Sequence, residues 1–166
     1  MEILDEGFPE AVRAKAEKHF KAGRFFCAES VLRSILDESG NKDHRDLVAL
    51  ASGFATGMGG AGCACGAVVG GIMAIGFFFG RATPGDAKVF DCMKLAHELH
   101  DAFRDHHKAV CCRILNKGLK HGSDEQQAMC ALRTANAAEM AARIIQREFR
   151  KVKESSSEAT VELPSA

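Results

Sequence analysis

A long uncharged segment near the middle of the chain most constrains how the protein folds. No Asp, Glu, Lys or Arg occurs in residues 47–80. Its second half, residues 63–80, reads CACGAVVGGIMAIGFFFG and would be apolar on every side of a helix. A helix of that kind lies inside a protein core or in a membrane. Gly62, Gly66 and Gly70 recur every fourth residue, a spacing of small residues that lets helices approach closely.

Two environments fit this apolar segment. A membrane span needs about 20 apolar residues, and the segment is long enough for the span to stay open as an alternative. The segment is nevertheless rich in glycine, begins like a loop, and lacks a Trp/Tyr belt or a flanking lysine cluster, since the chain holds no Trp and no Tyr. We therefore expect a buried core helix and no membrane contact.

Helical spacing also dominates the rest of the chain, whereas strand signals are scarce. The pattern predicts an all-α fold, a compact bundle of about five to seven helices around a central apolar, Gly-rich helix, Gly66–Phe79. The other expected helices are Pro9–Lys21, Phe26–Glu38, Asp46–Phe54, Asp86–His107 and Asp124 to about Lys151, with a short element over Cys111–Leu115.

Finer features of these helices can be predicted as well. The amphipathic pattern of residues 86–107 marks a set of candidate core positions: Val89, Met93, Leu95, Ala96, Leu99 and Phe103. Ser123 is the expected N-cap of the last helix, and Gln126 completes a capping-box pattern. We expect a single helical domain over residues 1–151, followed by a disordered polar tail over residues 152–166.

The charge balance excludes some function classes. Lys plus Arg and Asp plus Glu number 22 each, so the formal net charge is zero. Such a chain lacks the basic footprint of nucleic-acid binding, and we expect no nucleic-acid partner. The first residues, MEILDEGFPEAVR, do not read as a secretory signal, which favours a cytoplasmic location. No P-loop, dinucleotide fingerprint or acyl-transfer set occurs.

The seven cysteines carry the functional signal. An odd number in a reducing compartment argues against a structural disulfide framework. No CxxC occurs, so neither a thioredoxin-like pair nor a zinc ribbon is indicated, and no CxxCH occurs, so we expect no covalent c-type haem. Cys27 and Cys65 fall at predicted helix starts, where the helix dipole favours a thiolate over a thiol.

The order of motifs resembles a known family. Residues 65–70 read CGAVVG, a CGAxxG motif, after the Gly-rich stretch 53–60 and before FFFG at 77–80. Cys27 lies upstream, Cys112 precedes Arg-Ile-Leu, and Cys130 lies on the last helix. Over residues 8–148 this order resembles the redox-active family named for its C, GCAxxG, C, C pattern. It is also similar to the helical part of split-Soret cytochromes, without their haem motifs.

The resemblance implies a helical domain with four characteristic cysteines, which fall on Cys27, Cys65, Cys112 and Cys130. They would serve as catalytic thiols in thiol–disulfide exchange with an unidentified redox partner, or as ligands of an Fe–S cluster or zinc. The sequence does not separate these two forms. The alternative is a non-catalytic binding or structural module, in contact with itself or a membrane through residues 62–80, with passive thiols. A homodimer is compatible with the apolar composition.

Other residues offer weaker sites. Cys63 and Cys111 adjoin motif cysteines and could replace them or act as resolving thiols, whereas Cys92 reads as a buried inert thiol. On the predicted helix 86–107, His97 and Asp101 share a face at i, i+4 and could bind a divalent metal. We expect a solvated polar face there instead.

Overall fold

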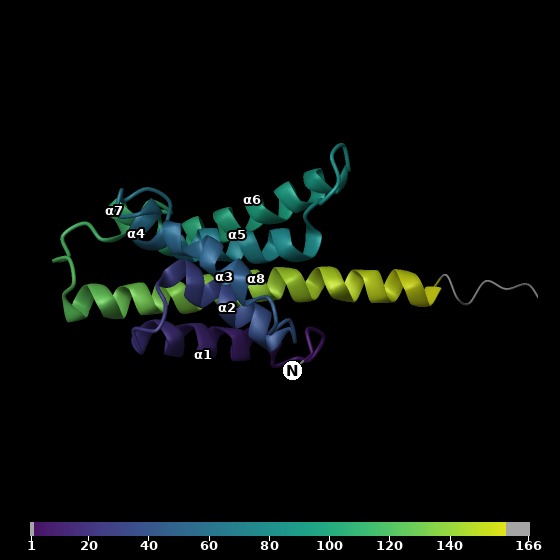
Figure 1. Cartoon of the computed structure of the whole chain (residues 1–166), viewed down its shortest axis with the longest axis horizontal. Coiled ribbons are helices and arrows are strands. Elements are labelled where there is room, and N and C mark those ends of the chain that lie inside the picture. Colours follow the sequence, from purple (N-terminus) through teal and green to yellow (C-terminus); the bar gives the residue numbers. More distant parts are fainter. Residues whose placement is uncertain (1, 159–166) are drawn as a thin grey trace, which may run out of the picture.

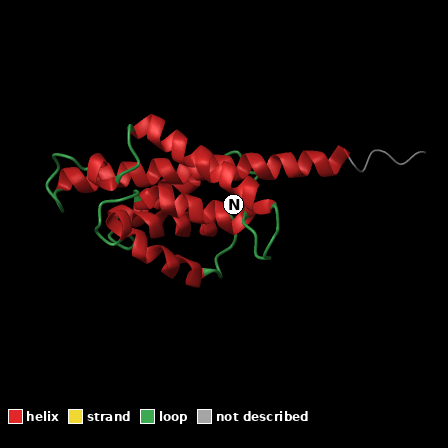
Figure 2. Ribbon diagram, turned by 90° about the horizontal axis from the view of Figure 1, so that it is seen from above, coloured by secondary structure: helices red, strands yellow, loops and turns green. Residues whose placement is uncertain are grey.

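The structure is a computed structural model that describes residues 2–158, and it is built from helices (Figure 1, Figure 2). Within these residues the only β pairing is an isolated bridge between Ala64 and Cys111. The predicted all-α fold is confirmed, and six of the α-helices have seven residues or more. The helices are α1 (Phe8–Lys21), α2 (Cys27–Glu38), α3 (Arg45–Ala51), the 3-10 helix η1 (Ser52–Phe54), α4 (Ala55–Met58), α5 (Gly66–Phe79), α6 (Lys88–His107), α7 (Cys112–Leu115) and α8 (Asp124–Glu158).

Helix α8 forms the long axis of the bundle. It contacts α1, α2, α5 and α6, and in Figure 1 it runs between α1 on one side and the α5–α6 pair on the other. The faces that it turns to these helices carry small side chains, which allow close packing: Ala131, Ala135, Ala137, Ala138, Ala141 and Ala142 are all fully buried. Its last turns extend beyond the other helices (Figure 1).

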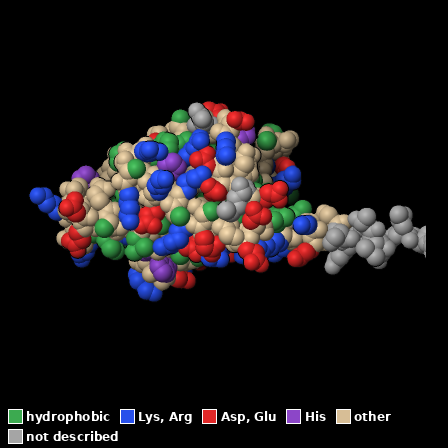
Figure 3. Space-filling model, turned by 90° about the horizontal axis from the view of Figure 1, so that it is seen from below, with side chains coloured by type: hydrophobic (Ala, Val, Ile, Leu, Met, Phe, Trp, Pro, Cys, Tyr) green, Lys and Arg blue, Asp and Glu red, His purple; other side chains and the backbone are tan. Residues whose placement is uncertain are grey.

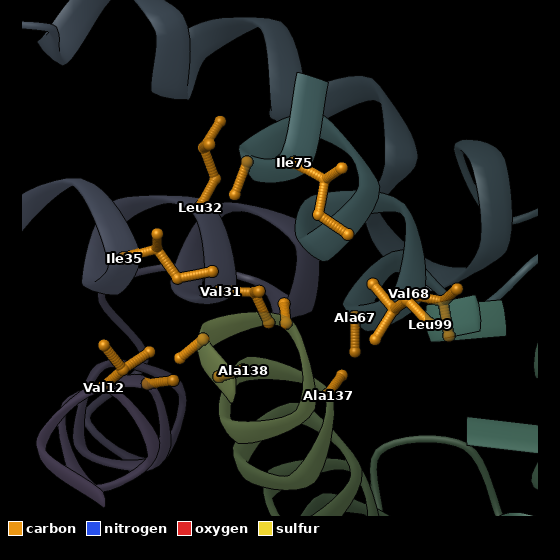
Figure 4. Close-up of a cluster of buried hydrophobic side chains, with 14 of the residues drawn as sticks. Val12, Val31, Leu32, Ile35, Ala67, Val68, Ile75, Leu99, Ala137 and Ala138 are labelled. Atoms are coloured by element: carbon orange, nitrogen blue, oxygen red, sulfur yellow. The ribbon is translucent and has the colours of Figure 1, made fainter. Parts of the chain in front are cut away.

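Helix α5 is the apolar helix expected from the sequence, and it packs into the core. Figure 4 shows Val68 and Ile75 of α5 among side chains of α2, α6 and α8. Val68 is 3% exposed and Ile75 fully buried, and each such side chain stabilises the fold by about 1.5–3 kcal/mol relative to an exposed position. Among residues 2–158, no helix combines the length and the apolar character needed to cross a membrane.

The N-terminus of α8 confirms Ser123 as the predicted N-cap, but the hydrogen bond of the Gln126 side chain differs from that of a regular capping box. The backbone N–H of Gln126 donates to Ser123 Oγ at 3.3 Å, so Ser123 is the N-cap. The Gln126 side-chain oxygen accepts from the Gly122 N–H at 2.6 Å, one residue earlier than a regular capping box requires. At its other end α8 continues past Lys151 to Glu158. Residues 159–166 of the predicted tail lie outside the described residues.

Helix α6 does not bury all of the residues predicted for its core-facing side. Leu99 and Phe103 are fully buried, as expected, but Met93 is 61% exposed and Phe90 is 64% exposed. The predicted core position of Met93 is therefore wrong. In Figure 1 the N-terminal half of α6 diverges from α5, and only the side of this half that carries Cys92 and Leu95 packs partly against the core, so Met93 faces solvent. Val89, Leu95 and Ala96 are half-buried.

The distribution of charged side chains on the surface is consistent with the formal net charge of zero. In the face shown in Figure 3, acidic and basic side chains are interspersed, without a large region of one sign. Many of them pair with each other, such as Arg147 with Glu98 and Arg143 with Glu139. Exposed ion pairs of this kind contribute at most about 1 kcal/mol each.

Candidate functional site

Four cysteines from four parts of the chain line one cavity of about 220 Å³. They are the four that the sequence singled out, and the structure brings them together. Cys27 begins α2, Cys65 immediately precedes α5, Cys112 begins α7 and Cys130 lies near the start of α8. The cavity is completed by Phe20, Phe26, Thr56, Leu115, Asn116, His121, Gln126, Gln127, Arg133 and Thr134.

The glycines of the CGAxxG motif let α5 approach α2 at this cavity. A Cβ at Gly66 would lie 2.5 Å from Cys27 Sγ, and a Cβ at Gly70 would lie 2.3 Å from the carbonyl oxygen of Ala28. Both distances are below the 3.0 Å that real Cβ contacts reach. Glycine at these positions therefore lets the start of α5, with Cys65 beside it, pack against Cys27.

Backbone hydrogen bonds hold Cys65 close to Cys112. The N–H of Cys65 donates to the Val110 oxygen at 2.7 Å, and the N–H of Cys112 donates to the Cys63 oxygen at 2.6 Å. These two bonds flank the isolated bridge between Ala64 and Cys111. The segment before α5 and the segment before α7 are thus joined, which fixes two of the four cavity cysteines relative to each other.

Asn116 connects the sulfurs of Cys112 and Cys130. Its Nδ2 donates to Cys112 Sγ at 3.4 Å, and its Oδ1 accepts from Cys130 Sγ at 3.6 Å. Asn116 is not among the residues predicted from the sequence. Its spacing of four residues from Cys112 was the available signal, because residues at i and i+4 of one helical turn lie on the same face.

Arg133 is the second residue that the sequence analysis missed. It is 6% exposed and lines the cavity. Its guanidinium donates to Asn116 Oδ1 at 3.0 Å and to the Leu115 oxygen at 2.6 Å. Burial raises the pKa of the Cys130 thiol, while the charge of Arg133 and a side-chain hydrogen bond from it lower that pKa. Its spacing of three residues from Cys130 on α8 would have indicated this proximity.

Burial raises the pKa of all four cavity thiols. For Cys65, burial raises the pKa to about 12, although hydrogen bonds from the backbone of Ala67 and Val68 act in the opposite direction. Burial also raises the pKa of Cys27 and outweighs its hydrogen bond with the Ala28 backbone. The prediction that the helix starts hold these two cysteines as thiolates is therefore wrong, because desolvation outweighs the helix-end N–H groups.

The other three cysteines lie outside the cavity wall. Cys63 is exposed, and Cys111 donates its S–H to the Gly62 oxygen at 3.1 Å. Cys92 is half-buried against the core, and burial raises the pKa of its thiol. The resolving roles considered for Cys63 and Cys111 stay predictions.

The histidine-rich face of α6 is a network of exposed polar contacts. The Asp101 carboxylate accepts from His100 Nδ1 at 2.8 Å and pairs with Arg104 at 2.9 Å, while His97 lies 3.4 Å away and is 75% exposed. Across residues 2–158, no group of three or more His, Cys, Asp or Glu side chains is arranged to hold a metal ion. The contacts of Asp101 agree with the solvated polar face expected from the sequence.

Comparison with known proteins places the chain in a family. A family model described as "Putative redox-active protein (C_GCAxxG_C_C)" matches residues 25–144, a range that contains all four cavity cysteines. No curated protein and no solved structure matches the chain. The matched range covers most of the chain and includes the CGAxxG motif at residues 65–70. The chain belongs to the redox-active protein family named for its C, GCAxxG, C, C pattern.

Proposed function

We propose that the protein transfers electrons by reversible thiol–disulfide exchange in the four-cysteine cavity. The observation that carries this proposal is the convergence of Cys27, Cys65, Cys112 and Cys130 on one cavity. Passive thiols have no reason to gather, whereas a redox site needs at least two sulfurs within reach of each other. The gathering therefore favours a redox site over the alternative of a binding module with passive cysteines.

Within the cavity, Cys112 and Cys130 are the best placed reacting pair. Both are partly exposed, whereas Cys65 is 7% exposed. The Asn116 carboxamide contacts both sulfurs. Burial raises the pKa of both thiols, but Asn116 and Arg133 lower it in each case. Because only the thiolate attacks a disulfide, the pair next to the guanidinium reacts before the more deeply buried Cys65.

The exchange proceeds in two balanced steps. The Cys130 thiolate attacks one sulfur of a partner disulfide, the partner S–S bond breaks, and the released partner sulfur takes up a proton. Cys112 then loses its proton and attacks the Cys130 sulfur of the mixed disulfide, which releases the second partner sulfur as a thiol. The partner gains two electrons and two protons, while Cys112 and Cys130 become a disulfide.

An all-cysteine metal centre is the other form predicted from the sequence. Its ligands would be Cys27, Cys65, Cys112 and Cys130, and a four-thiolate set is the chemistry of zinc and Fe–S sites. The described side chains show no group of three or more such ligands arranged for a metal ion. The metal form stays a prediction, which metal analysis can test.

The pair assignment can be tested in redox buffers. The wild-type protein is equilibrated with oxidised and reduced dithiothreitol, its thiols are alkylated, and the modified sites are counted by mass spectrometry. We expect two thiols to disappear and return together, and Cys112→Ser or Cys130→Ser to abolish this behaviour. Cys92→Ser is the matched control, because Cys92 lies outside the cavity. Unchanged pairing in both cavity variants would overturn the assignment.

A further inference from the structure

Arg133 is a buried cation without an acidic partner. Its guanidinium donates to the neutral oxygens of Asn116 and Leu115 and forms a hydrogen bond with the Cys130 thiol, while its Nε is buried without a partner among the described residues. No acidic side chain of residues 2–158 forms an ion pair with it, and it is only 6% exposed. Several other arginines pair with carboxylates, including Arg13 with Glu139, Arg33 with Asp37, Arg104 with Asp101 and Arg147 with Glu98.

The wall of the cavity beside Arg133 supplies no carboxylate to compensate its charge. None of its described lining residues is an Asp or a Glu. A buried charge is costly unless an opposite charge or several hydrogen bonds compensate it. Because no carboxylate of the described residues compensates its charge, Arg133 has the capacity to pair with an anion that enters the cavity. Planar guanidinium groups bind carboxylates with two parallel hydrogen bonds where the geometry allows.

The size and lining of the cavity restrict what that anion is. Its volume of about 220 Å³ is below the roughly 300–1,000 Å³ of pockets that hold drug-sized ligands. Phe20, Phe26 and Leu115 give it apolar walls, while four cysteines occupy other parts of the wall. A compact molecule with a short apolar body and one anionic end matches this lining.

We propose that the cavity binds a small disulfide that carries a carboxylate, and that the carboxylate pairs with Arg133 while the S–S bond lies against Cys130. This inference rests on the proposed thiol–disulfide exchange and names its substrate class. The chemistry is the two-step exchange given above: the small disulfide is reduced to two thiols, and Cys112 and Cys130 are oxidised. Arg133 neither gains nor loses a proton and acts as a binding residue.

Arg133 has a competing role that the test must separate. It lies close enough to Cys130 for charge and hydrogen bonding to favour the thiolate. If Arg133 acted only in this way, its loss would slow every disulfide equally, whatever the charge of that disulfide. If Arg133 also binds the substrate, its loss would remove the preference for anionic disulfides.

Three disulfides of similar size and different charge provide the probes: 3,3′-dithiodipropionate (anionic), bis(2-hydroxyethyl) disulfide (neutral) and cystamine (cationic). The rate of thiol loss is measured at constant ionic strength and divided by the rate of each disulfide with 2-mercaptoethanol. Wild type, Arg133→Met and Arg133→Lys are compared after helicity is checked by circular dichroism. Arg143→Met is the matched control, because Arg143 lies on the same helix, is 54% exposed, and is not part of the cavity wall.

We expect wild type to prefer the anionic over the cationic disulfide by about tenfold or more, the order of one charge-assisted hydrogen bond. Arg133→Met should lose this preference, while Arg133→Lys and Arg143→Met should keep most of it. Equal normalised rates for the three disulfides in wild type would overturn the inference and leave the proposed exchange intact. So would an equal slowing of all three in Arg133→Met. If none of them oxidised the wild-type thiols, the proposed function would fail with the inference.

Discussion

Replacing Gly70 by alanine should push α2 and α5 apart. A Cβ at this position would lie 2.3 Å from the Ala28 carbonyl oxygen and 3.0 Å from its carbonyl carbon, whereas ordinary contact begins at 3.4 Å. The obstacle is the backbone of α2, which cannot rotate away as a side chain could. The change therefore requires a shift of a whole helix at the cavity wall.

The size of the effect follows from two opposing contributions. Alanine is favoured over glycine in a helix by about 1 kcal/mol, which stabilises the variant. Overpacking of a well-packed core costs typically about 1–3 kcal/mol, and more where backbone must move. The clash with the Ala28 carbonyl is severe, so we expect Gly70→Ala to lower the free energy of unfolding by about 2 kcal/mol.

Gly76 of the same helix provides the matched control, because a Cβ there would meet no atom within 4 Å. Gly76→Ala should raise the free energy of unfolding by about 0.5–1 kcal/mol through helix propensity alone. Both variants are unfolded in urea and followed by circular dichroism, and the midpoints are compared at equal slopes. Equal stability of Gly70→Ala and Gly76→Ala would contradict the predicted clash with the α2 backbone.

Three further predictions address the thiols and pH dependence. Cys63 is exposed and Cys65 is 7% exposed, so a bulky maleimide should label Cys63 in the native protein and Cys65 only after unfolding; equal labelling would contradict the burial. Asn116→Ala should slow alkylation of Cys112 at pH 8 about fivefold, because it removes a hydrogen bond of ~1 kcal/mol that lowers the pKa of the Cys112 thiol. An unchanged rate would exclude this role of Asn116. Burial lowers the pKa of His107 to about 4, so the unfolded chain binds the proton at a higher pH than the folded protein does. The free energy of unfolding should therefore fall as the pH drops from about 6.5 towards 4, and it should fall less in His107→Gln. Urea midpoints of both proteins at pH 7 and pH 5 would show this difference.

Much of the fold could be predicted from the sequence because its helices carry strong local signals. The uncharged segment 47–80 predicted a buried core helix, and the bounds of α1, α2 and α5 agree with the predicted ranges within one residue. The failure at Met93 shows the limit of periodicity. A helical face can be apolar without a neighbour to cover it, and only the tertiary arrangement decides which turns of α6 are covered.

The candidate site could be predicted only in part, and that part came from the family resemblance rather than from helical periodicity. The family resemblance named the four cysteines, and the cavity gathers those four and leaves Cys63, Cys92 and Cys111 outside its wall. The predicted thiolates failed because helix position is a local property, whereas desolvation depends on everything packed around a sulfur. Asn116 and Arg133 were missed although each lies one helical turn from a motif cysteine.

The central claim is that the cavity thiols are redox partners, and disulfide mapping tests it most directly. The protein is purified anaerobically, analysed for zinc and iron, oxidised mildly, and digested for mass spectrometry with the disulfides intact. The account predicts metal-free protein with a reversible disulfide that joins Cys112 and Cys130. Stoichiometric metal would establish the metal form instead, and seven thiols that remain free and unreactive would contradict the account.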